Sequence, residues 1–133
     1  MKFKLGRVLG VALAVAAFGM GNANAASVVI QEVYYDQPGA DGTEVFTELF
    51  GSPGMSLDGF SLVGINGSVG EDYGTIDLSG FTIQADGISL IADINTNLTG
   101  ADLLAASIDW QNGVDAVQLR FFDGNSVIVA DAL

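Results

Sequence analysis

Short runs of β-forming residues, separated by clusters of Gly, Asp and Asn, are the feature that most constrains how this chain can fold. After residue 26 the runs recur about every 8–12 residues, a spacing typical of antiparallel sandwiches and barrels. Apolar and polar side chains alternate along residues 116–122, as they do on a half-buried strand. The following Asp123-Gly124-Asn125 has the chemistry of a hairpin turn into residues 126–131. The sequence therefore predicts an all-β fold.

The other strands are expected between the turn clusters. The pattern predicts them at residues 27–35, 44–50, 60–65, 75–78, 81–83 and 88–92. Residues 93–107 are ambiguous, because Thr99 followed by Asp102 resembles a capping box and Leu103 and Leu104 favour helix. A helix of at most two turns is the alternative to an extended segment there.

The first 25 residues have the three parts of a secretory signal peptide. Lys2, Lys4 and Arg7 form a cationic start, residues 9–20 are uncharged and mostly apolar, and Ala23-Asn24-Ala25 offers small residues for cleavage. An uncleaved membrane anchor is the alternative, but the apolar run is shorter than the ~20 residues that cross a bilayer. We therefore expect a signal peptide at 1–25, one domain at 26–133, and a secreted or periplasmic protein that has left the membrane.

The composition excludes several kinds of chemistry. The chain has no cysteine and no histidine, which rules out a Ser-His-Asp triad, a thiol nucleophile, a disulfide framework and an ordinary zinc site. Three of the four basic residues lie in residues 1–25 and all 16 acidic residues lie beyond them, so residues 26–133 carry a formal net charge of −15. Because this charge repels phosphate backbones and anionic lipid, we expect neither nucleic acid nor a membrane surface as a partner.

Five strings occur in order along residues 27–133. They are VVIQEVYYD at 28–36, FTELF at 46–50, LDGFSL at 57–62, FTIQADG at 81–87 and QNGVDAVQL at 111–119. Together they resemble the motifs of the lamin-tail domain, which ends nuclear lamins and occurs in many exported bacterial proteins. Asp58 and Gln84 depart from the small residue and the proline usual in that family, and Leu133 falls inside its last strand, which would leave a sheet edge poorly covered.

The resemblance implies an immunoglobulin-like antiparallel β-sandwich that binds ligands or accompanies other domains. It supplies no catalytic residues. Among the carboxylates, Glu44 and Glu48 would lie on one strand face with about 13 Å between their Cα atoms, too far apart for a retaining glycosidase. A pair across strands, such as Glu32 with Glu48, is an alternative that the sequence does not support. We therefore expect no catalytic site and no enzyme.

A binding surface is expected along one strand. In residues 44–50 the side chains alternate, so that Val45, Thr47 and Leu49 share one face. The opposite face carries the candidate ligand-binding residues Glu44, Phe46, Glu48 and Phe50. Trp110, the single tryptophan, is a further candidate as a stacking platform for a sugar, although a lone tryptophan more often packs in a core or at its rim.

Calcium is the one cofactor that the residues suggest. Asp93, Asn95 and Asn97 offer oxygen ligands at alternate positions, as at the start of a Ca²⁺ loop. The loop fails as an EF-hand, because Leu98 and Leu104 stand where Gly and Glu are needed. Asp36 and Asp41 lie in Gly-rich loops and are further candidate ligands. The alternative is an acidic surface that only water and dissolved ions contact.

These observations favour an exported, non-catalytic β-sandwich that binds or attaches to a protein, surface or polymer ligand. An alternative from another class is an N-terminal accessory domain of a larger exported hydrolase or nuclease, truncated at Leu133, and an in-frame continuation downstream would favour it. An independent carboxylate hydrolase is the third and least supported hypothesis.

Overall fold

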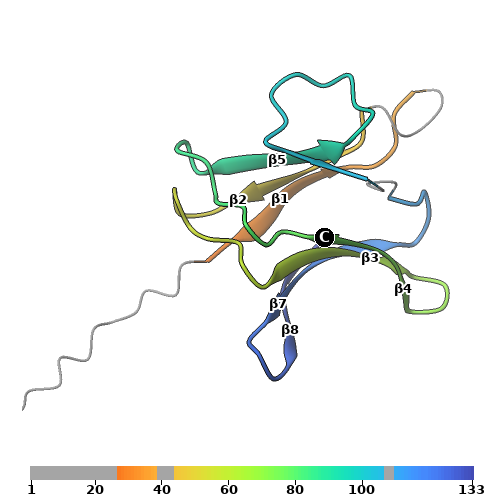
Figure 1. Ribbon diagram of the computed structural model, residues 1–133. Coiled ribbons are helices and arrows are strands. Elements are labelled where there is room, and N and C mark those ends of the chain that lie inside the picture. The colour runs from red at the N-terminus through yellow and green to blue at the C-terminus, as the bar shows by residue number, and fades with distance from the viewer. Residues whose placement is uncertain (1–26, 39–43, 107–109) are drawn as a thin grey trace, which may run out of the picture.

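The computed structural model describes residues 27–38, 44–106 and 110–133, which form two four-stranded sheets facing each other (Figure 1). The first sheet has the strand order β1-β2-β5-β6 and the second has the order β4-β3-β7-β8. The strands are β1 (Val29–Tyr34), β2 (Phe46–Phe50), β3 (Phe60–Asn66), β4 (Glu71–Asp77), β5 (Ile88–Asp93), β6 (Leu103–Ala105), β7 (Ala116–Phe122) and β8 (Val127–Ala132).

The described residues contain no α-helix, so the prediction of an all-β fold built as a sandwich is confirmed. None of them belongs to a helix long and apolar enough to span a bilayer. The predicted signal peptide at 1–25 and the candidate ligand Asp41 lie outside the described residues.

The core lies between the two sheets and is built from alternate positions of the strands. On β2, Thr47 and Leu49 point inward and are fully buried, whereas Phe46, Glu48 and Phe50 point outward. The alternation predicted for this strand is therefore confirmed. Each fully buried aliphatic side chain contributes about 1.5–3 kcal/mol relative to an exposed one, in a chain that has no disulfide. The largest of them are Leu49, Leu57, Leu62, Leu78, Ile83, Ile91 and Leu119.

The helix considered for residues 93–107 is not formed where the structure describes that segment. Leu103–Ala105 make β6, which pairs in parallel with β5 and so makes the first sheet mixed rather than wholly antiparallel. The backbone N–H of Asp102 donates to the carbonyl of Leu90 over 2.8 Å, and the Asp102 carboxylate accepts from the Leu90 N–H over 2.8 Å. The free edge of β5 thus offers backbone partners, whereas an isolated helix of two turns is unstable in water.

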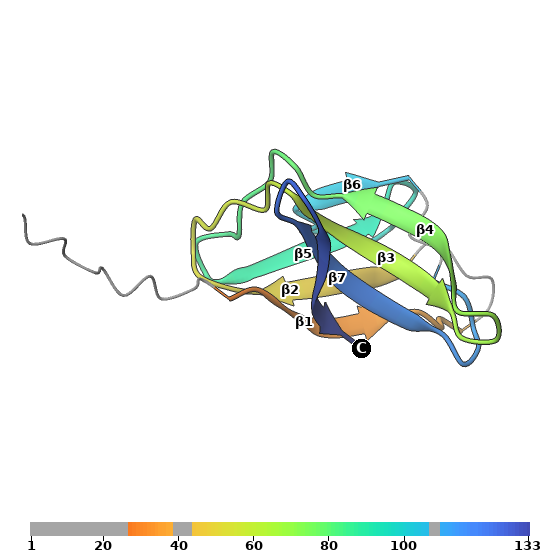
Figure 2. The ribbon, with the colours of Figure 1, turned by 90° about the horizontal axis from the view of Figure 1, so that it is seen from below.

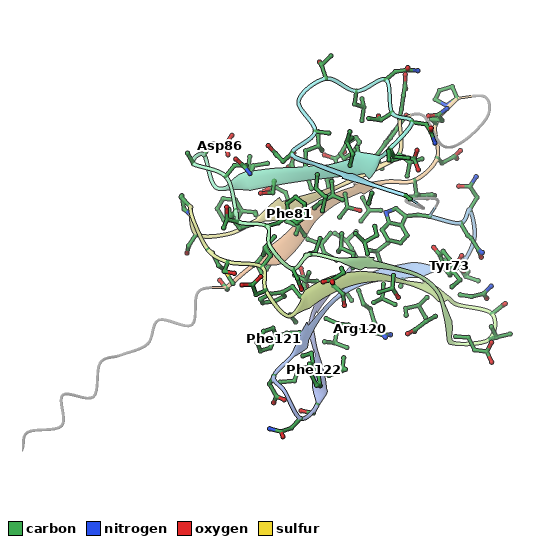
Figure 3. The ribbon with its side chains drawn as sticks, in the orientation of Figure 1. Tyr73, Phe81, Asp86, Arg120, Phe121 and Phe122 are labelled. Atoms are coloured by element: carbon green, nitrogen blue, oxygen red, sulfur yellow. The ribbon has the colours of Figure 1, made fainter. Side chains whose placement is uncertain are left out.

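Two strand predictions also change. Residues 81–83 form no strand, because only a single bridge joins Thr82 to Ser56, flanked by backbone hydrogen bonds. Phe81 lies in the space between the sheets (Figure 3). The strand expected at 75–78 is longer, since β4 pairs with β3 from Glu71 onward.

The β7–β8 hairpin forms around the predicted turn and gives the second sheet its outer edge (Figure 2). The carboxylate of Asp123 accepts hydrogen bonds from the backbone N–H groups of Asn125 and Ser126, each over 2.8 Å, which closes the turn. Near the end of β8, Asp131 Oδ2 accepts from the Ile30 N–H of β1 over 2.8 Å. This bond ties the two sheets together along the side where both have edge strands.

Candidate functional site

The outward side of the first sheet contains the residues of β2 that the sequence predicts to bind a ligand. Pairing of β2 with β1 and β5 sets these residues into three rows across the sheet. The rows are Val29–Phe50–Ile88, Glu32–Glu48–Leu90 and Tyr34–Phe46–Ala92, of which Ala92 is fully buried and does not reach the surface. We call this surface the β1–β2–β5 outer face.

Two of the three rows are apolar or aromatic. Phe50 is 50% exposed and its neighbour Val29 is 38% exposed. At the other end of the face, the rings of Tyr34 and Phe46 stack with their centroids 5.5 Å apart and their planes at 23°. Stacking holds Phe46 against β1, so this aromatic pair forms a fixed surface on the solvent side of the sheet.

The middle row brings two carboxylates together. The register of β1 shifts between Ile30 and Glu32, and this irregularity turns Glu32 to the outer side, directly opposite Glu48. Like charges directly opposite each other on antiparallel strands destabilise the pair. Glu44 lies just before β2 and is exposed, and its backbone N–H donates to Gln37 Oε1 over 2.7 Å, which fixes the start of the strand.

Trp110 does not contribute to this face. It is only 2% exposed, and its indole N–H donates to Thr47 Oγ1 over 2.8 Å inside the core. This burial agrees with the packing interpretation, whereas a stacking platform for a sugar would need an exposed ring; the small exposed part of Trp110 lines the cavity described below. The bond also explains why a threonine occupies an inward position of β2, since a buried indole N–H needs an acceptor.

The carboxylate of Asp93, the first candidate calcium ligand, belongs to a turn. Asp93 is 7% exposed, and its Oδ1 accepts from the backbone N–H of Asn95 over 2.7 Å and from the Asn95 side-chain amide over 3.1 Å. Asp36 and Asn97 are exposed. Among the described residues no three acidic, histidine or cysteine side chains are arranged to hold a metal ion.

Several aspartates outside the β1–β2–β5 outer face also close turns. The backbone N–H of Gly80 donates to Asp58 over 2.7 Å, and this bond holds the pKa of the Asp58 carboxyl below its ordinary value. The hydroxyl and N–H of Ser79 lower the pKa of Asp77 in the same way. A general acid needs a raised pKa, so these carboxylates serve as structural anions.

A cavity of about 130 Å³ opens at one end of the sandwich. Its lining includes Tyr35, Tyr73 on β4 (labelled in Figure 3), Trp110 and Asp115. Two of its polar side chains already bind the backbone. The Tyr73 hydroxyl accepts from the Gln111 N–H over 3.0 Å, and Asp115 Oδ1 accepts from the Gly67 N–H over 3.0 Å. The cavity therefore offers a mainly apolar wall.

Strand alternation in the sequence predicts only the β2 part of the β1–β2–β5 outer face. The parts from β1 and β5 depend on strand order and on the register shift before Glu32, and short alternating runs specify neither. In comparisons with known proteins, no family model, no curated protein and no solved structure matches the chain.

Proposed function

We propose that this protein is an exported, non-catalytic β-sandwich module of lamin-tail type, which binds or attaches to a protein through its β1–β2–β5 outer face. The observation that carries the proposal is the presence of apolar side chains on the solvent side of that sheet, of which Val29 and Phe50 are exposed and Tyr34, Phe46 and Ile88 are partly exposed. The outer side of an antiparallel sheet is usually polar. Here Val29, Phe50 and Ile88 form one row, and Tyr34 and Phe46 belong to another.

The strand order supports an immunoglobulin-like sandwich. In such folds strands A, B, E and D form one sheet, and strands C, F and G, with C′ added in the variable type, form the other; the described residues contain no strand at the chain position of D, between β4 and β5. The order β1-β2-β5 corresponds to A-B-E, and β4-β3-β7-β8 corresponds to C′-C-F-G. The short β6 departs from this scheme, because it follows β5 in the chain and pairs with it in parallel.

The setting of the carboxylates supports a non-catalytic role. Glu32 and Glu48 are opposite each other, but they lie on an outward sheet surface where Glu32 is exposed and Glu48 is half-buried. Hydrolysis by two carboxylates needs environments that push the two pKa values apart, usually by shielding one carboxyl from water. An outward sheet surface gives little such shielding.

The proposal is tested by photo-crosslinking from two matched positions. Phe50 is 50% exposed on the first sheet and Phe122 is 53% exposed on β7 of the second, so each can be replaced by a photoreactive phenylalanine analogue. In the producing cells we expect a discrete protein adduct from position 50 and none from position 122. The adduct is then identified, and the purified partner must bind the wild-type protein. Equal adducts from both positions, or no adduct from position 50, would contradict the proposal.

A further inference from the structure

The β1–β2–β5 outer face carries two carboxylates for which no basic side chain is available. Arg120 is the only basic residue after Arg7. It lies on the second sheet, where both of its terminal nitrogens bind Asp72 over 2.6 and 2.8 Å (Figure 3 shows Arg120). The single cation of this domain is therefore already bound by a carboxylate through two hydrogen bonds. The opposite carboxylates Glu32 and Glu48 have no such partner among the described residues.

The apolar rows on either side of these carboxylates indicate that a partner has apolar groups beside its cations. Lysine and arginine lay their alkyl stems along apolar surface while the charged group reaches a carboxylate. The row of Val29, Phe50 and Ile88 offers such a surface, and the Tyr34 and Phe46 rings lie beyond the carboxylates on the other side. An aromatic ring also attracts a cation that sits over its face.

We infer that the partner is a protein segment that presents lysine or arginine between apolar side chains. Its cations lie between Glu32 and Glu48, and its apolar groups cover the neighbouring rows. The inference rests on the proposed function and adds the chemistry of the ligand. Charge complementarity selects this occupant, because a second copy of the domain would bring a formal charge of −15 and no free cation to the face.

The test uses the purified protein and capped extended peptides as probes. The first peptide alternates lysine with leucine, the second replaces each lysine by glutamate, and the third replaces each lysine by serine. NMR chemical shifts of the backbone amides report where each peptide binds. We expect the lysine peptide to shift amides of β1, β2 and β5, to bind more weakly as NaCl rises, and to bind at least about fivefold more tightly than the serine peptide.

Two single variants separate a specific site from general attraction by an acidic protein. Glu48→Gln and Glu71→Gln each remove one charge from a glutamate on a strand, but Glu71 lies on β4 of the second sheet. We expect Glu48→Gln to weaken the lysine peptide about fivefold and Glu71→Gln to leave it nearly unchanged. Equal weakening by both variants, or no shifts on the β1–β2–β5 outer face, would overturn the inference.

The same titrations distinguish this inference from the proposed function. If the serine peptide binds the β1–β2–β5 outer face as tightly as the lysine peptide, the inference that the partner is cationic is wrong, but the face remains a binding surface. If position 50 gives no protein adduct, by contrast, the proposed function itself is wrong.

Discussion

Arg120 makes three hydrogen bonds on the outer side of the second sheet, and they allow its contribution to stability to be worked out. Its Nη1 and Nη2 donate to the two carboxylate oxygens of Asp72 over 2.6 and 2.8 Å, and its Nε donates to Gln118 Oε1 over 2.9 Å. The Arg120 side chain is 21% exposed and that of Asp72 is 49% exposed. Solvent therefore screens much of the attraction, and exposed pairs contribute about 0.2–1 kcal/mol.

Bidentate geometry places this pair at the upper end of that range, so we expect a coupling free energy of about 1 kcal/mol at low salt. For a domain of this size that corresponds to a change in Tm of about 4 °C. The coupling is measured by a double-mutant cycle with Arg120→Gln and Asp72→Asn, each unfolded by denaturant. In 1 M NaCl, where the Debye length is about 3 Å, the coupling should fall to less than half.

The same pair predicts a pH dependence. The hydrogen bonds from Arg120 hold the pKa of Asp72 below its ordinary value. The folded protein thus releases this proton more readily than the unfolded chain, and the pair stabilises the fold fully above the ordinary pKa of about 3.9. Its contribution is lost as the pH falls through the lower, folded value.

A control cycle pairs Arg120→Gln with Asp86→Asn. Asp86 lies at a turn of the opposite sheet, where its carboxylate accepts from the Ile88 N–H over 3.0 Å (Figure 3). This cycle should show no coupling. A coupling near zero between Arg120 and Asp72 at low salt, or one that is unchanged in 1 M NaCl, would show that this pair does not stabilise the fold as a solvent-screened ion pair.

Three further predictions concern packing and ions. Trp110→Phe leaves the buried Thr47 hydroxyl without its donor and should cost about 1–3 kcal/mol by denaturant unfolding, less when Thr47→Val is present as well. Gly67→Ala should lower the Tm sharply, because a Cβ there would overlap the backbone carbonyl oxygen of Val114. Gly74→Ala, with open space around it, should cost far less. Added NaCl should raise the Tm between about 0.01 and 1 M, because it screens the repulsion among the acidic residues. Millimolar CaCl₂ in constant high salt should not raise the Tm further, because the Asp93 carboxylate already closes its turn.

The sequence predicts the features of this fold that depend on local pattern. The faces of β2 follow from the alternation of Thr47 and Leu49 with Phe46 and Phe50, and the β7–β8 turn follows from the chemistry of residues 123–125. What it does not predict depends on contacts distant in the chain. Leu103–Ala105 become a strand because β5 has a free edge.

The candidate site also has a part that local pattern predicts and a part that depends on distant contacts. The pattern of one strand is enough to predict that Phe46, Glu48 and Phe50 share a face. The position of Glu32 opposite Glu48 depends on the pairing of β1 with β2 and on the register shift after Ile30. The buried position of Trp110 also depends on a distant contact, since its indole N–H donates to the Thr47 hydroxyl, which lies 63 residues earlier in the chain. Short-range pattern carries no information on either contact.

We propose the β1–β2–β5 outer face as the contact surface of the protein. The most direct test of this proposal is the Kd for the partner captured at position 50, compared between Phe50→Ser and Phe122→Ser. The two phenylalanines are almost equally exposed and lie on opposite sheets, so each variant removes a similar apolar surface. We expect Phe50→Ser to raise the Kd about tenfold or more and Phe122→Ser to leave it unchanged. A Kd that rises with Phe122→Ser and not with Phe50→Ser would contradict the account.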